Sequence, residues 1–421
     1  MKTANFELAK QLRHELHSHP EISNEERWTK QRLMDFLAEH TKLNIVDRGL
    51  WFYAVYKAKR TRAEADAKNQ YATGIAEGAL STDIAEGATS TDKAESAAPT
   101  GAANDTGYGN DGVKRIAFRA DFDAVPIEDE IEENHRSQIP GVGHKCGHDG
   151  HAAALAGLAL EVDRQEASSD VYFIFQHAEE TGDGAKLCAE LIDECHIHEI
   201  YSFHNMSGYP EGAVVVREGT IWCASKGMEI GFEGTPAHAS LPETGRNPAF
   251  AVASIVNQVS DLIAPQRYKG LVLCTVIQMD VGERAFGCAA SRGKLLLTIR
   301  AQYEEELNQL QQELEGLARA EGEKYGLAVT FDFCDEFPET VNETGCVEKI
   351  RSAAAALGLP VIEIEKPMRS SEDFGYFLKR TAGAMFFLGN GEDYPPIHTA
   401  KYDFPDEQIR IAVEMFKTLL G

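Results

Sequence analysis

The chain has 421 residues, more than one hydrophobic core usually serves, so its length favours two domains or one large domain with an insertion. Hydrophobic residues make up 43 % of the chain and charged residues 26 %, and this ordinary globular composition excludes fibrous proteins and wholesale disorder. The 67 Asp and Glu against 41 Lys and Arg give a formal charge of -26, which repels nucleic acid and anionic lipid, so we expect no nucleic-acid or membrane partner.

The cellular location is predicted from the same composition. No run approaches the roughly 18 apolar residues of a membrane span, and the amino-terminal residues include no apolar signal-peptide segment. The eight cysteines are scattered between Cys146 and Cys346, without the density of a secreted disulfide scaffold. We therefore expect a cytoplasmic protein with mostly reduced thiols.

Residues 1–40 predict two amphipathic helices separated by a turn at Pro20, and a strand is expected over residues 51–56. Residues 60–112 are rich in Ala, Gly, Thr, Ser and Asp, and a nine-residue unit, IAEGALSTD and then IAEGATSTD, occurs twice in succession. So little apolar surface cannot offset the entropy of ordering the chain, which favours a flexible low-complexity insertion between two strands. A short repeat solenoid is the alternative.

Strands and helices alternate from residue 114 to 221 and again after 336, which is typical of a mainly parallel sheet covered by helices. Between 224 and 335 the expected order is βαββαβ, the order of a ferredoxin-like unit. The predicted fold class is therefore α/β. Residues 1–223 and 336–421 are expected to form the catalytic domain, with residues 224–335 inserted as a smaller domain.

A cluster of metal-binding residue types lies in the segment HKCGHDGH at 144–151. Cys and His suit a borderline-soft divalent ion such as zinc, and Gly147 gives the loop freedom to aim Cys146 and His148 at one point. One loop supplies only two or three ligands, so we expect others from elsewhere in the chain.

Further candidates follow later strands, because chemistry in such sheets gathers at the carboxyl ends of strands. One strand leads into Glu179 and Glu180, the next ends in His204, and His398 lies in a proline-rich loop near the carboxyl terminus. A Glu pair can divide the work, since one carboxylate binds metal while the other moves a proton. A solvated acidic turn is the alternative for this pair. The acidic segment 370–374 is either a further source of carboxylates or a capped helix N-terminus.

Seven motifs in order along the chain are similar to those of one enzyme family. They are LHSHPEISNEE at 16–26, RADFDAVPIED at 119–129, HKCGHDGH at 144–151, FQHAEETGDGA at 175–185, GTPAHASLPETGRNP at 234–248, SEDF at 371–374 and PPIHTAKYDF at 395–404. On these motifs the chain resembles the metal-dependent amidohydrolases of the aminoacylase and carboxypeptidase metallopeptidase superfamily, in the branch of hippurate hydrolase, auxin-conjugate hydrolases and N-acetyldiaminopimelate deacetylase. The resemblance runs over nearly the full length, apart from residues 57–113.

The resemblance implies a role for each matching residue. It implies one or two divalent ions per subunit, with Zn, Mn, Ni and Co as candidates, and five metal ligands: Cys146, His148, Glu180, His204 and His398. It also implies Glu179 as the general base. The inserted domain is expected to form a homodimer and to present His238 to the substrate carbonyl.

Three positions bear on how much of the family pattern applies. The family usually has Pro where this chain has His177, and an Asn-Val-Ile-Pro-like segment where this chain has residues 287–291. The second departure leaves the ligands untouched and bears on substrate specificity. Arg300 matches a recurrent family arginine, with an exposed strand arginine as the alternative.

The expected function is hydrolysis of the amide bond of a small N-acyl amino acid or a related conjugate, with Glu179 as general base. A dipeptidase or carboxypeptidase with the same metal site is the nearest alternative. A catalytically silent metal-binding protein is the alternative from a different class.

Overall fold

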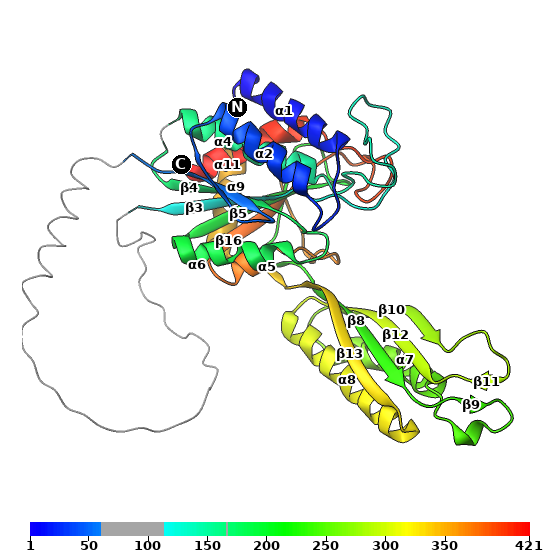
Figure 1. The fold of residues 1–421 in the computed structure, drawn as a ribbon. Helices are drawn as coiled ribbons and strands as arrows, with labels where there is room; N and C mark the ends of the chain where they lie inside the picture. Colours follow the sequence, from blue (N-terminus) through cyan, green and yellow to red (C-terminus); the bar gives the residue numbers. More distant parts are fainter. Residues whose placement is uncertain (60–112, 166) are drawn as a thin grey trace, which may run out of the picture.

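A large mixed sheet organises most of the molecule (Figure 1). The computed structural model describes residues 1–59, 113–165 and 167–421, so the insertion expected over 60–112 lies outside the described residues. The strands follow the order β1-β2-β4-β3-β5-β16-β6-β15 across the sheet. Their bounds are β1 Asn44–Asp47, β2 Phe52–Tyr56, β3 Arg115–Asp121, β4 Asp170–Gln176, β5 Glu199–Met206, β6 Val214–Val216, β15 Val361–Glu363 and β16 Ala382–Gly389. The central strands β4, β3, β5 and β16 run parallel, which confirms the mainly parallel sheet expected from the sequence.

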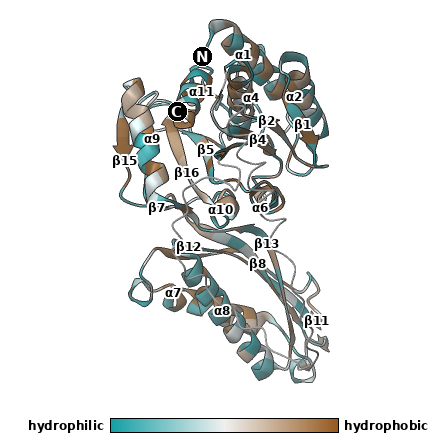
Figure 2. Ribbon diagram, turned by 90° about the vertical axis from the view of Figure 1, so that its left-hand side faces the viewer, coloured by the Kyte–Doolittle hydropathy of each residue, from teal (hydrophilic) through white to brown (hydrophobic). Residues whose placement is uncertain are grey.

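Helices cover both faces of this sheet, so side chains that alternate along a strand enter two different cores (Figure 1). Phe118 of β3 packs into the core of the first face, and its neighbour Ala117 packs into the core of the second. On the first face are α1 Thr3–Ser18, α2 Arg27–His40, α4 His148–Arg164, α9 Thr344–Leu357 and α11 Glu407–Leu420. On the second are α5 Gly184–Cys188, α6 Glu190–Cys195 and α10 Gly375–Leu378. Figure 2 shows strand β16 of this sheet mostly brown, as expected for a strand buried on both faces.

Helix α4 lies at the centre of the first layer and is buried on all sides from His148 to Val162. It contacts β3 on one side and α1, α2 and α11 on the other. Sequence periodicity predicts its start near His151, but the helix begins at His148 because Gly147, with φ 101°, turns the chain in the left-handed region just before it. The helix expected near 184–194 is instead two short helices, α5 and α6.

The second sheet is formed by residues between 224 and 337 and has the order β10-β12-β8-β13, with every neighbouring pair antiparallel. Its elements are β8 Ala224–Glu233, α7 Ala249–Leu262, β10 Val272–Val281, β12 Arg292–Ala301, α8 Glu304–Tyr325 and β13 Ala328–Phe337. This is the βαββαβ order of a ferredoxin-like unit, as the sequence predicts. A two-stranded sheet of β9 Ala237–His238 and β11 Cys288–Ala289 lies at its far end (Figure 1).

The two chain segments that connect the second sheet to the rest of the molecule pair with each other. Strands β8 and β13 are neighbours, with Phe337 opposite Ser225. Just beyond them β7 Gly219–Trp222 pairs with β14 Thr340–Asn342, with Thr340 opposite Trp222. The chain therefore enters and leaves the second sheet through one two-stranded ribbon.

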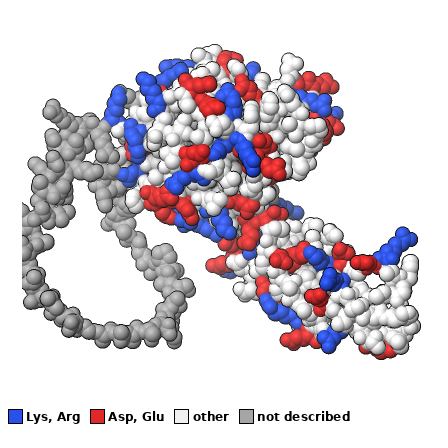
Figure 3. Space-filling model, in the orientation of Figure 1, with Lys and Arg blue, Asp and Glu red and all other residues white. Residues whose placement is uncertain are grey.

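The surface carries both signs of charge. On the face drawn in Figure 3, Asp and Glu are interspersed with Lys and Arg over both parts of the molecule. Within residues 1–59, 113–165 and 167–421, no helix combines the length and apolar character needed to cross a membrane.

Candidate metal centre

The carboxyl ends of three parallel strands bring the candidate residues together. Strand β3 ends at Asp121, β4 leads directly into residues 177–180, and β5 carries His204. Because neighbouring parallel strands end at the same edge of a sheet, these residues share one location, where ligands bind in open α/β sheets.

Gly147 allows the cysteine loop, which we define as residues 144–149, to pass close to its neighbours. A Cβ at this position would lie 2.3 Å from Asn205 Oδ1 and 2.8 Å from the hydroxyl of Tyr402. The residue also has φ 101°, so a side chain here would be strained as well as crowded. The glycine therefore lets Cys146 and His148, on either side of it, face the same space.

Two overlapping groups of ligand atoms meet there and share Cys146. One group is Cys146, His148 and His204, the other is Cys146, Glu180 and His398, and within each group the ligand atoms lie within 4.8 Å of one another. Cys146 Sγ lies 3.4 Å from His204 Nε2, and Glu180 Oε1 lies 3.2 Å from His398 Nε2 and 3.8 Å from His148 Nε2. All five candidate ligands are thus in one place, arranged as two adjacent triads.

Two of the three candidate ligand histidines, His148 and His204, are oriented as metal ligands require. Nδ1 of His148 donates towards Asp123, with the carboxylate oxygen at 3.0 Å and the backbone carbonyl at 3.1 Å, and its buried Nε2 has no hydrogen-bond partner among the described residues. Nδ1 of His204 donates to the carbonyl of Asn205 at 2.7 Å, so its Nε2 faces Cys146. Fixing one ring nitrogen in this way presents the other to a metal ion. The residues therefore fit a divalent cation.

The charge around Cys146 favours the same conclusion. Burial and the carboxylates of Glu180 and Glu179 hold the pKa of the Cys146 thiol well above its usual range. Burial alone would lower the pKa of His148, but the carboxylates of Asp121 and Asp123 outweigh it and raise this pKa to about 10. A site so rich in buried negative charge is stabilised by a cation, and a coordinated thiol loses its proton.

Glu179 lies beside the triads and is buried, with Oε2 3.9 Å from His148 Nε2. Burial and then the neighbouring carboxylates of Glu372 and Glu180 raise the pKa of Glu179 well above its usual value. The alternative of a solvated acidic turn for Glu179 and Glu180 is wrong, because this pair packs against the ligand histidines. A buried carboxylate at this position is suited to accept a proton.

Sequence reasoning missed the ion-pair cluster next to Glu179. Arg119, fully buried at 1 % exposure, lies 2.7 Å from Asp121, 3.0 Å from Glu372 and 2.8 Å from Asp373. The motifs RADFDAVPIED and SEDF contain all four residues, but nothing in their spacing shows that they pair. The capped-helix reading of 370–374 is wrong, because α10 begins after Phe374 and no side chain caps it.

His238 lies apart from the other candidates within one chain. It is exposed on β9 opposite Cys288, and its Nδ1 lies 2.7 Å from Ser240 Oγ. No metal-ligand cluster in the described part of the chain includes it, and Figure 1 shows β9 at the end of the second sheet farthest from β3 and β5.

His177 and Arg300, the two other residues compared with the family pattern, are both at least partly withdrawn from solvent. His177 is fully buried, and neither ring nitrogen has a partner among the described residues. Arg300 bonds to Ser371 Oγ, next to the Arg119 cluster, so the alternative of an exposed strand arginine is wrong.

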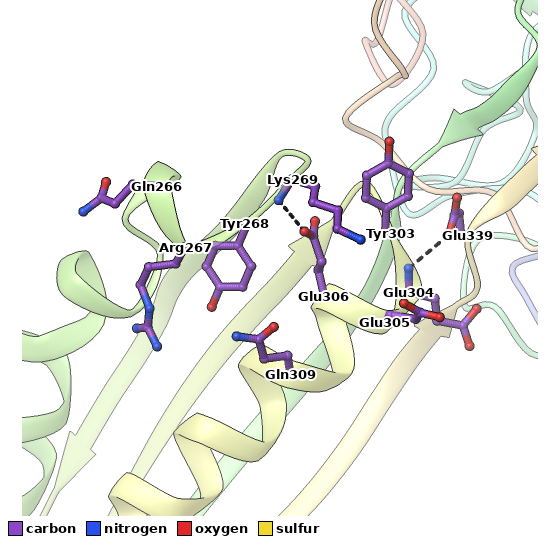
Figure 4. Close-up of a pocket in the computed structure, with 10 residues that line it drawn as sticks. All are labelled: Gln266, Arg267, Tyr268, Lys269, Tyr303, Glu304, Glu305, Glu306, Gln309 and Glu339. Carbon is purple, nitrogen blue, oxygen red and sulfur yellow. Dashed lines mark hydrogen bonds between the residues drawn. The ribbon is translucent and has the colours of Figure 1, made fainter.

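A cavity of about 780 Å³ lies elsewhere, between the α7–β10 connection and the start of α8 (Figure 4). It contains none of the residues discussed above. Two of its carboxylates already have partners, since Glu306 accepts the backbone N–H groups of Lys269 and Gly270 and Glu339 accepts that of Glu304. We therefore locate the functional site by its ligand geometry and not by the size of a cavity.

Comparison with known proteins agrees with this geometry. Residues 117–421 match the family described as Peptidase family M20/M25/M40. The chain belongs to this family. An N-acetyldiaminopimelate deacetylase of Exiguobacterium sibiricum is 30 % identical over 302 residues, which cover 70 % of this chain and 80 % of that protein. The resemblance inferred from the motifs is thereby confirmed.

Solved structures share the fold. The Bacillus subtilis YXEP protein, described as a dinuclear metal binding peptidase from the M20 family, is 20 % identical and has a TM-score of 0.74, covering 100 % of this chain and 98 % of that one. The aminopeptidase PepT of Bacillus cereus is 13 % identical with a TM-score of 0.66, covering 99 % of this chain and 98 % of that one. These likenesses confirm the predicted α/β fold with its inserted ferredoxin-like part.

Proposed function

We propose that the protein is a metal-dependent amidohydrolase that cleaves the amide bond of small N-acyl amino acids or related conjugates. The observation that carries this proposal is the pair of triads sharing Cys146, with the buried carboxylate of Glu179 beside them. The deacetylase relative supports an N-acyl amino acid as substrate. The formal charge of -26 disfavours binding to nucleic acid or to anionic lipid, so this proposal includes no such partner.

In this proposal Cys146, His148, Glu180, His204 and His398 would hold one or two divalent ions, and Cys146 is the residue that belongs to both triads. When bound, the ions supply Lewis-acid chemistry at the scissile carbonyl and at water. Glu179 accepts the proton of the attacking water and passes it to the leaving nitrogen. Asp123 holds His148 in the orientation that exposes Nε2.

We further propose that His238 acts from the partner subunit of a homodimer. Within one chain His238 lies apart from the triads, so it reaches the site only if the inserted domain folds over it or a partner subunit supplies it, and the family resemblance favours the partner subunit. There it would donate a hydrogen bond to the developing oxyanion. The inserted domain, residues 224–335, would form the dimer, and residues 1–223 and 336–421 would form the catalytic domain.

The metal and the location are also proposals. The mixed Cys, His and Glu ligand set suits Zn, Mn, Ni or Co better than a hard ion such as Ca. Cys146 can bind a metal ion only while it is reduced and not in a disulfide. Because cytosolic cysteines are kept reduced, this supports a cytoplasmic location.

The test is turnover by the metal-depleted chain reloaded separately with Mn, Zn, Co and Ni. Release of acetate from N-acetyl amino acids, including N-acetyldiaminopimelate, and of benzoate from benzoylglycine is measured beside the hydrolysis of dipeptides. Metal-dependent release from the N-acyl substrates supports the proposal. Preferential cleavage of dipeptides would instead show a peptidase, and metal uptake without turnover of any substrate would show a silent metal-binding protein.

A further inference from the structure

Arg13, on helix α1, is remote in sequence from every candidate ligand but is fully buried beneath the metal centre. Its guanidinium is surrounded by carboxylates from two other segments. Nε donates to Asp149 Oδ2 at 2.9 Å, one terminal nitrogen donates to Asp406 Oδ1 at 3.1 Å, and the other donates to Asp403 Oδ1.

These carboxylates belong to the two segments that contain the candidate ligands His148 and His398. Asp149 directly follows the candidate ligand His148 in the cysteine loop. Asp403 and Asp406 lie in the connection between β16 and α11, residues 390–406, which also contains His398 and which we call the His398 loop. One buried side chain therefore bonds to both loops.

The cysteine loop and the His398 loop also form direct hydrogen bonds around Lys145. The backbone N–H of His398 donates to the carbonyl of Lys145 at 2.6 Å, and Lys145 Nζ donates to the carbonyl of Tyr402 at 2.8 Å. Both bonds involve the start of the cysteine loop. Arg13 fixes its other end, at Asp149, against the same partner loop.

We propose that Arg13 is a positioning residue that sets the spacing between the cysteine loop and the His398 loop, and with it the separation of the two triads. This inference rests on the two-ion form of the proposed centre and adds a determinant outside it. A lysine cannot replace the arginine, because the planar guanidinium offers several donors in a fixed fork whereas an ammonium is a single point charge. With lysine, we expect the His398 loop to shift relative to the cysteine loop, while β5 and His204 stay in place and the bonds around Lys145 still connect the two loops.

The test is titration of the metal-depleted full-length chain with Co²⁺, followed by calorimetry and by the thiolate-to-cobalt absorption that reports on Cys146. We expect two ions per wild-type chain. Arg13→Lys should keep the first ion and the thiolate band, but bind the second ion about 10- to 100-fold more weakly, the usual cost of losing an outer partner of a ligand. Activity is not needed for this readout.

Two further variants keep the inference falsifiable if Arg13→Lys fails to fold. Asp403→Asn removes the charge of one of the two His398-loop carboxylates that bond to Arg13, from a residue that is 21 % exposed and that also contacts His135. It should weaken the second ion in the same direction but by less, because Asp406 still accepts from Arg13. Arg32→Lys is the matched control, because Arg32 bonds to Glu15 of the same helix α1 but reaches neither loop. It should bind both ions like the wild type.

The outcomes separate this inference from the proposed function. A wild-type chain that binds fewer than two ions overturns the two-ion centre, and this inference with it. A two-ion wild type with unchanged binding in Arg13→Lys or Asp403→Asn overturns the inference alone. Equal loss of both ions in a folded Asp403→Asn variant also overturns it, because the arginine would then support the whole centre and not its spacing.

Discussion

Asp123 Oδ1 lies 3.0 Å from Nδ1 of His148, and the backbone carbonyl of Asp123 lies 3.1 Å from the same nitrogen. The imidazole is therefore held by a residue just after the end of β3, while Nε2 lies near Cys146 and Glu180 with no hydrogen-bond partner among the described residues. The same carboxylate also accepts hydrogen bonds from Ser23 Oγ at 2.7 Å and from the backbone N–H of Glu180 at 3.0 Å.

Asp123→Asn should therefore weaken metal binding without removing a ligand. We expect affinity to fall about 10- to 100-fold, since such partners of ligand histidines fix ring orientation. Metal content after dialysis against a buffered metal series measures this. Asp193→Asn, which changes an exposed carboxylate on α6, is the control and should retain wild-type affinity. Equal affinities in the two variants would contradict the role given to Asp123.

Glu179→Gln and Glu180→Gln should fail in different ways. The first keeps the shape of the side chain but cannot accept a proton, so turnover should fall about 10²- to 10⁴-fold with metal content unchanged. The second removes a charged ligand and should release metal. Elemental analysis and turnover of both variants decide between the roles, and the reverse pattern would exchange base and ligand.

Cys146→Ala should affect both ions, because Cys146 belongs to both triads. The loss of affinity should exceed the roughly 10- to 100-fold cost of removing an outer partner, since the alanine cannot coordinate a metal. Cys188→Ala is the matched control, because Cys188 is also a buried thiol but lies in α5 away from the ligands. An alanine variant at 146 that retained full metal would exclude the cysteine loop as the site.

Mixing two inactive variants tests whether His238 acts between subunits. His238→Ala chains have an intact base and Glu179→Gln chains have an intact β9 histidine, so a mixed dimer contains one complete site of two. Random exchange of an equal mixture should then restore about one quarter of wild-type turnover in a two-fold symmetric dimer. No recovery in a mixture shown to exchange subunits would mean that His238 acts within its own chain.

Glu26 should make the folded chain less stable as the pH rises. It is 5 % exposed, and burial, followed by the nearby Asp123 carboxylate, raises its pKa from 4.5 to about 8. Between these two pH values the folded chain holds a proton that the unfolded chain has released, so stability falls as pH increases through this window, by an amount on the order of a few kcal/mol.

Glu26→Gln removes this penalty and still offers an oxygen to the backbone N–H of Ala178, which Glu26 Oε1 now accepts at 2.8 Å. Thermal midpoints of the metal-depleted chain at pH 5 and pH 8.5 measure the effect. The variant should gain more at pH 8.5 than at pH 5, whereas the exposed neighbour Glu25→Gln should change little at either pH. An equal shift at both pH values would show that Glu26 is not protonated in the folded state.

The sequence is sufficient for those parts of the site that are local. Cys146 and His148 are close in the chain, and the glycine between them indicates an aimed loop, so their meeting could be predicted. The Asp123–His148 and Arg13–Asp149 contacts join residues 25 and 136 positions apart, and one sequence shows the residue types but not such pairings. The same limit explains why the Arg119 cluster was not foreseen.

Helix periodicity has a comparable limit. It places Trp28 on the apolar face of α2 together with Leu33, Phe36 and Leu37, yet Trp28 is 37 % exposed. Its ring stacks on His19 instead, with the centroids 4.5 Å apart. A helical pattern shows which side chains share one face of the helix. It does not show which other residues bury that face, because those residues come from elsewhere in the chain.

The two-stranded ribbon has a consequence for how this architecture can be built and taken apart. Because Thr340 pairs with Trp222 and Phe337 lies opposite Ser225, the points at which the second sheet begins and ends are adjacent in space. A hairpin turn of two to five residues could therefore join β7 to β14 in place of the whole ferredoxin-like unit, without displacing any strand of the large sheet. The ferredoxin-like unit is therefore a single insertion attached at one place. It could be removed, or exchanged for another unit, at that one junction while the large sheet stays intact.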